Sequence, residues 1–120
     1  MTHKPTVRVR RVYDAPAQTD GTRVLVDRIW PRGMTKEKAH LDEWCQQIAP
    51  SVELRKWYIR NPGRFAEFSH RYQAELQGPE RADALAHLRD LAEDRTLTLL
   101  TATKHPETSK AEVLAGLLRC

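Results

Sequence analysis

The densest group of side chains capable of chemistry lies in one run, Asp-Arg-Ile-Trp-Pro-Arg-Gly, at positions 27–33. Its two guanidinium groups suit a planar oxyanion because each can donate two parallel hydrogen bonds at once. A glycine at the end of the run lets the backbone approach a ligand closely. The candidate ligand-binding residues are Arg28, Trp30, Arg32 and Gly33, and Asp27 is a candidate catalytic base or a group that orients an arginine. A structural alternative stays open, in which the aspartate pairs with an arginine, the tryptophan fills core and the rest is a turn.

A second candidate segment, Thr101–His105, follows a β-rich run late in the chain. Lys104 would add a point charge to an anion site, and His105, the second catalytic candidate, could carry a proton. The alternative interpretation is an exposed loop before a helix. Adjacent parallel strands would bring both segments to one sheet edge, where α/β proteins bind ligands. The two segments then predict one pocket for a small phosphate- or carboxylate-bearing ligand, with Asp27 as its only acid.

Three β-rich runs predict the strands that would position these segments, at 7–10, 22–30 and 96–102. The last run is apolar and threonine-rich throughout, which predicts burial on both faces, as in a parallel sheet. Helical periodicity and capping residues predict helices at 35–48, 51–58, 65–76, 85–94 and 109–118. The sequence therefore predicts a single α/β domain over residues 1–120, with a three-stranded, mainly parallel sheet flanked by about five helices.

The orientation of the first two strands is left open by the sequence. Only about ten residues separate them, whereas a parallel crossover usually needs a dozen or more. The pair is therefore either antiparallel or joined by a shortened crossover. Residues 1–5 read as a flexible polar tail.

The aromatic residues of the predicted helices lie on apolar stripes, which indicates core packing. Trp44, Trp57, Phe65 and Phe68 are the predicted core residues of this kind. Cys45 shares a face with apolar neighbours and reads as a buried, unreactive thiol. No Walker loop, dinucleotide fingerprint, serine-nucleophile elbow or CxxC pair is present, and the histidines lack metal-ligand spacing. No metal and no cofactor is predicted.

The composition is that of an ordinary globular protein, with 40% hydrophobic and 30% charged residues. No stretch is long and apolar enough to predict a membrane span or signal peptide, so we expect a cytoplasmic protein without a membrane partner. Residues 1–36 hold eight Lys/Arg against three Asp/Glu, which concentrates the +4 net charge there. An alternative function is therefore weak, sequence-independent nucleic-acid or partner binding through Arg8, Arg10, Arg11 and Arg23. Oligomeric state and reaction type are not predicted.

Five segments of the chain resemble the YeaO-like family, a bacterial group of unknown function: 11–14, 21–33, 48–51, 54–57 and 99–104. The resemblance implies a compact bacterial cytoplasmic α/β domain. Longer relatives carry a helix between the first two strands, which favours parallel strands here with a shortened crossover. Relatives also carry cysteines and a Cys-His-Arg segment where this chain has Thr101 and Thr108-Ser109-Lys110, so the resemblance implies no thiol chemistry in this chain.

Overall fold

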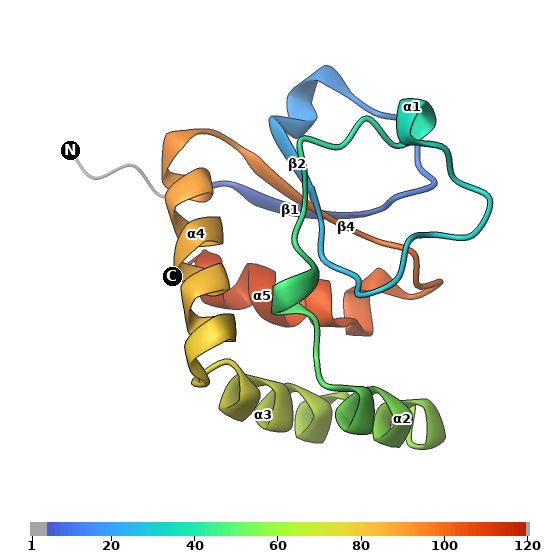
Figure 1. The fold of residues 1–120 in the computed structure, drawn as a ribbon, viewed down its shortest axis with the longest axis vertical. Helices are drawn as coiled ribbons and strands as arrows, with labels where there is room; N and C mark the ends of the chain where they lie inside the picture. Colours follow the sequence, from blue (N-terminus) through green and yellow to red (C-terminus); the bar gives the residue numbers. More distant parts are fainter. Residues whose placement is uncertain (1–4, 120) are drawn as a thin grey trace.

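The sheet is fully parallel and contains four strands in the order β1-β4-β2-β3 (Figure 1). They are β1 (Val7–Arg11), β2 (Thr22–Leu25), β3 (Glu43–Trp44) and β4 (Leu97–Thr101). The computed structural model describes residues 5–119. The predicted tail falls outside these residues except at Pro5, and Cys120 also falls outside them.

The strand β4 is one of the two inner strands of the sheet and is buried along its whole length. Leu99 lies opposite Val9 on one side and opposite Val24 on the other. This confirms the predicted burial and the parallel pairing of the second and third predicted strands. It also resolves the orientation of β1 and β2, which run parallel but are separated by β4, with only a 3-10 turn (Gln18–Asp20) in their connection.

The helix predicted over 35–48 is wrong for most of its length, and this segment instead supplies the fourth strand. Thr35 does cap a helix, but α1 (Lys36–Ala39) ends after one turn at His40, whose φ of 47° is left-handed. Asp42 then binds the main chain of Arg23 twice, through its own N–H (2.9 Å) and its carboxylate (2.8 Å). These bonds dock the chain on the sheet edge as β3, because they satisfy β2 groups that would otherwise lack partners.

The remaining helices overlap their predicted positions, although the fourth begins six residues earlier than predicted. They are α2 (Val52–Arg60), α3 (Phe65–Glu75), α4 (Pro79–Asp94) and α5 (Lys110–Leu118), with 3-10 turns at Gln46–Ile48 and Pro106–Thr108. Ser51 and Ser109 cap α2 and α5 with their side chains, as their residue types favour. Among residues 5–119, no helix combines the length and apolarity that a membrane crossing requires.

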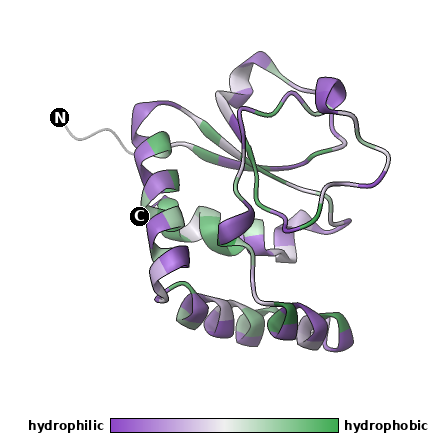
Figure 2. Ribbon diagram, in the orientation of Figure 1, coloured by the Kyte–Doolittle hydropathy of each residue, from purple (hydrophilic) through white to green (hydrophobic). Residues whose placement is uncertain are grey.

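The two faces of the sheet are covered differently. Val24, Val26 and Leu99 belong to the larger core, which α2, α3, α4 and α5 complete. Leu25 and Leu100 belong to a smaller cluster on the other face, which α1 and the loops around it cover. In Figure 2, hydrophobic residues predominate in α5, as expected for a buried helix. Hydrophobic and hydrophilic residues alternate along α4, as expected for a half-exposed helix.

The predicted aromatic core is confirmed in part. Phe68 is buried, and Trp57 and Phe65 pack against the core while half-buried. Trp44 is 37% exposed, so its assignment to the core is wrong. The reason is the replacement of the predicted helix by β3, a two-residue strand at the edge of the sheet with a neighbouring strand on one side only.

Candidate functional site

A cavity of about 700 Å³ lies beyond the carboxyl ends of β1, β2 and β4. Its lining comes from the segments that follow these strands, from α2 and from the start of α5. We call it the carboxyl-edge cavity. Its volume falls within the range of small-molecule sites in proteins, roughly 300–1,000 Å³. The parallel sheet thus brings the two predicted site segments together, as the sequence predicts.

Five of the seven predicted site residues line this cavity: Asp27, Arg28, Trp30, Arg32 and His105. Lys104 is exposed and is not part of the lining. Gly33 also lies outside it, and its φ of 74° shows that this glycine serves a turn. The lysine that lines the cavity is Lys110, not the predicted Lys104.

The carboxylate of Asp27 ties three elements together. One oxygen accepts a hydrogen bond from the Thr101 hydroxyl (2.8 Å) and from Lys110 Nζ (2.9 Å). The other oxygen accepts the Ala102 backbone N–H at 2.8 Å. With both oxygens engaged, Asp27 fits the orienting role better than that of a free base. It holds the ends of β2 and β4 and the start of α5 in one arrangement.

Lys110 is the site residue that sequence reasoning missed. The sequence predicts it within the helix at 109–118, nine positions beyond Thr101 and outside both candidate segments. A detectable signal exists, because a cation in the first turn of a helix opposes the helix dipole and needs a compensating partner. Asp27 is that partner, and only 19% of the lysine side chain remains exposed.

Three further cationic side chains line the cavity, and one of them, Arg55 of α2, was also missed. Arg28 donates to the Pro50 carbonyl at 3.2 Å, and Arg32 and Arg55 are exposed. None of the three forms an ion pair with a carboxylate of the described residues. Among the described lining residues, four cations therefore face a single carboxylate, which already pairs with Lys110.

The loop that carries Arg28 is braced by indole and amide groups. Trp44 donates to the Asp27 carbonyl (2.7 Å), and Trp30 donates to the Met34 carbonyl (2.7 Å). The two indole rings meet edge to face, with centroids 5.3 Å apart. Gln46 adds a bond to the Arg28 carbonyl at 3.0 Å. The β3 segment thus positions the site loop, a role that the predicted helix did not suggest.

The floor of the cavity is aromatic. Tyr58 stacks on Phe68 with ring centroids 4.2 Å apart, and its hydroxyl donates to the Thr108 carbonyl at 2.7 Å. Burial raises the pKa of Tyr58, so this hydroxyl stays protonated at neutral pH. His105 lies at the exposed rim, with its ring nitrogen 3.5 Å from the Glu107 carboxylate.

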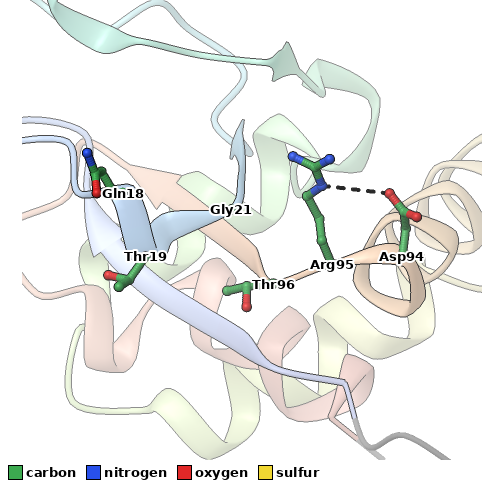
Figure 3. A pocket seen from close by; sticks show the side chains of 6 residues that line it. All are labelled: Gln18, Thr19, Gly21, Asp94, Arg95 and Thr96. Atoms are coloured by element: carbon green, nitrogen blue, oxygen red, sulfur yellow. Dashed lines mark ion pairs between the residues drawn. The ribbon is translucent and has the colours of Figure 1, made fainter.

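A second cavity lies at the opposite, amino edge of the sheet (Figure 3). Figure 3 shows that its side chains come from the turn before β2 and from the end of α4. Its two charged residues, Asp94 and Arg95, pair with each other at 3.8 Å. It therefore presents no uncompensated charge. Among residues 5–119, no group of three His, Cys, Asp or Glu side chains could hold a metal ion.

The basic residues of the first third are held by internal contacts. Arg8, Arg10 and Arg23 converge on the buried carboxylate of Asp20, at 3.3, 3.0 and 2.5 Å. Burial by itself raises the pKa of Asp20. The Ala17 backbone hydrogen bond and the arginines outweigh burial and hold this pKa below its ordinary value. Arg11 donates to the Thr103 carbonyl at 3.0 Å.

Comparison with known proteins places the chain in a family. The family described as "Inactive DUF488-N3 subclade" matches residues 6–120. An uncharacterised protein of Mycobacterium tuberculosis is 49% identical over 118 residues, which cover 98% of each chain. The uncharacterised protein YeaO of Escherichia coli is 43% identical over 113 residues, 94% of this chain and 96% of the relative. No solved structure matches the chain. The chain therefore belongs to the inactive N3 subclade of the DUF488 family and is YeaO-like, as its sequence motifs predict.

Proposed function

We propose that this protein is a cytoplasmic binding protein that holds a small phosphate- or carboxylate-bearing ligand in the carboxyl-edge cavity. The observation that carries the proposal is the charge imbalance of the described lining, four cations against one carboxylate. Arg28, Arg32 and Arg55 bring three positive charges to one cavity, and a bound oxyanion would offset them. Guanidinium groups without an acidic partner are also the donors best suited to an oxyanion.

Binding is favoured over catalysis by the state of the two catalytic candidates. Asp27 uses both carboxylate oxygens in internal hydrogen bonds, and His105 lies at the exposed rim beside Glu107. The described cysteine, Cys45, belongs to the core rather than to the cavity. The family description, an inactive subclade, also supports a binding role. A small enzyme acting on the same class of ligand remains the alternative within this site.

The internal contacts of the first third argue against nucleic acid as the main partner. Three of its arginines surround Asp20 and a fourth donates to a main-chain carbonyl, so these groups have fewer donors to offer phosphates. We expect any binding of duplex or single-stranded nucleic acid at physiological salt to be weak and independent of sequence.

Thermal unfolding in increasing phosphate, with ionic strength held constant by chloride, tests the proposal. A ligand of the native state raises the melting temperature saturably by mass action. Arg55→Gln should weaken phosphate binding about tenfold, because a charge-assisted hydrogen bond is lost. Arg32→Gln removes a second exposed guanidinium group of the cavity and should weaken phosphate binding by a similar factor.

Arg60→Gln is the matched control, because Arg60 is exposed on the same helix as Arg55 but does not line the cavity. The phosphate-induced shift should be unchanged in this variant. An equal loss in all three variants would show non-specific screening of positive charge and would contradict the proposal.

A further inference from the structure

Exposed apolar side chains gather around the carboxyl-edge cavity. Five large hydrophobic side chains are exposed in the described part of the chain, and three of them line this cavity. These are Tyr13 (41% exposed), Ile29 (60%) and Ile59 (67%). They come from three separate segments: the turn after β1, the loop after β2, and α2. Single exposed apolar residues are common, but their convergence on one cavity indicates a binding surface.

The apolar surface continues from the rim into the cavity. Tyr58 and Phe68 form a stacked pair at its floor, and Pro50 and Pro62 add flat apolar faces. An inorganic oxyanion satisfies the arginines but leaves this surface exposed to water. The volume of about 700 Å³ is also far more than one such ion fills.

We propose that the ligand is a small molecule in which the oxyanion is attached to an apolar, ring-bearing body, as in an aryl phosphate. This inference rests on the proposed function, because the same arginines bind the oxyanion of the ligand in each. Ile29 and Ile59 cover the ring, which packs against the aromatic floor. Burying these exposed side chains together with the ring removes apolar surface from water, and this is the source of selectivity over a bare anion.

Calorimetric titration with methyl phosphate, phenyl phosphate and phenol separates the two parts of the ligand. Phenyl phosphate should bind at least about tenfold more tightly than methyl phosphate, with a more negative heat-capacity change. The reason is that phenyl phosphate carries a ring that the cavity can bury, whereas methyl phosphate does not. Phenol should bind more weakly than phenyl phosphate, because it lacks the oxyanion.

Ile59→Ser should reduce the advantage of phenyl phosphate over methyl phosphate several-fold and leave methyl phosphate binding unchanged. The side chain is largely exposed, so its replacement leaves the fold intact. Ile59→Leu should keep the advantage. Val52→Ser is the matched control, because Val52 is exposed on the same helix but does not line the cavity.

The outcomes distinguish this inference from the proposed function. Equal affinity for methyl and phenyl phosphate would overturn the inference and leave anion binding in place. Absence of binding of either phosphate at millimolar concentration would overturn both. A short phosphotyrosine peptide that binds more than tenfold tighter than phenyl phosphate would overturn the assignment to a free small molecule.

Discussion

Asp27 acts as a connector between strand ends rather than as an isolated acid. Its carboxylate binds the Thr101 hydroxyl, the Ala102 backbone N–H and Lys110 Nζ. Sequence position alone predicts that this residue belongs to the site, because it lies at the carboxyl end of a predicted strand. Sequence position does not reveal which cation Asp27 orients, because that cation, Lys110, lies on a helix 83 positions away.

Cys45 is expected to be unreactive in the native protein. Burial raises the pKa of its thiol, so the nucleophilic thiolate is disfavoured. In a Cys120→Ser variant, where Cys45 is the only thiol left, a thiol reagent should react slowly until denaturant unfolds the chain. Rapid stoichiometric labelling of the folded variant would show that the core around Cys45 opens readily.

The free energy of unfolding is expected to depend on the ionisation of Asp20 at acidic pH. Its pKa is below the ordinary value of 3.8 in the folded protein, so the carboxylate stabilises the fold above that value. This contribution is lost as the pH falls below 3.8 toward the folded pKa. Asp20→Asn should lower the free energy of unfolding at pH 7 by about 3–5 kcal/mol, because it leaves the buried Arg23 uncompensated.

Urea unfolding at pH 7 and pH 3 measures both effects. The difference in stability between the variant and the original protein should shrink at pH 3, because this pH lies below 3.8 and protonation of Asp20 in the unfolded chain removes part of the stabilisation. A difference that stays constant with pH would mean that the residue contributes packing rather than charge.

At the scale of elements, the segment 41–48 shows why part of the fold could not be predicted. Leu41, Trp44, Cys45 and Ile48 follow helical spacing, yet the chain forms β3 and a 3-10 turn. The pairing of Asp42 with Arg23 decides the outcome, and such a long-range contact leaves no trace in local periodicity. The strands 7–11 and 97–101 and the helices α3, α4 and α5 were predictable because their own patterns agree with their environment.

Two glycines allow the cost of backbone strain to be separated from the cost of steric crowding. Both have positive φ, 64° at Gly21 and 74° at Gly33. A Cβ at Gly21 would lie 2.1 Å from the Thr96 carbonyl oxygen, whereas a Cβ at Gly33 would meet nothing within 4 Å. Gly33→Ala should therefore cost only the left-handed backbone strain, about 1–2 kcal/mol.

Gly21→Ala should cost that strain and about 1–3 kcal/mol more, because the β2–β4 pairing begins at Thr96 and must shift. Chemical denaturation of the two variants gives the comparison. Equal losses would mean that the backbone at Gly21 moves without disturbing the sheet.

At the scale of the whole molecule, the parallel sheet decides where the site lies. Successive strands end at one edge, so residues 27–32 and 102–110 meet there although about 75 positions separate them. The sequence predicts this meeting from strand directions. It does not predict the contribution of α2, because the angle at which a helix crosses a sheet depends on packing of the whole core.

A crystal structure of the protein soaked with tungstate would show whether this edge of the sheet holds an oxyanion. Tungstate mimics phosphate in shape and charge, and its anomalous scattering marks its position unambiguously. We expect an anomalous peak inside the carboxyl-edge cavity, within hydrogen-bond distance of at least two of Arg28, Arg32 and Arg55. An empty cavity, with tungstate bound only around the arginines of β1 or nowhere, would contradict it.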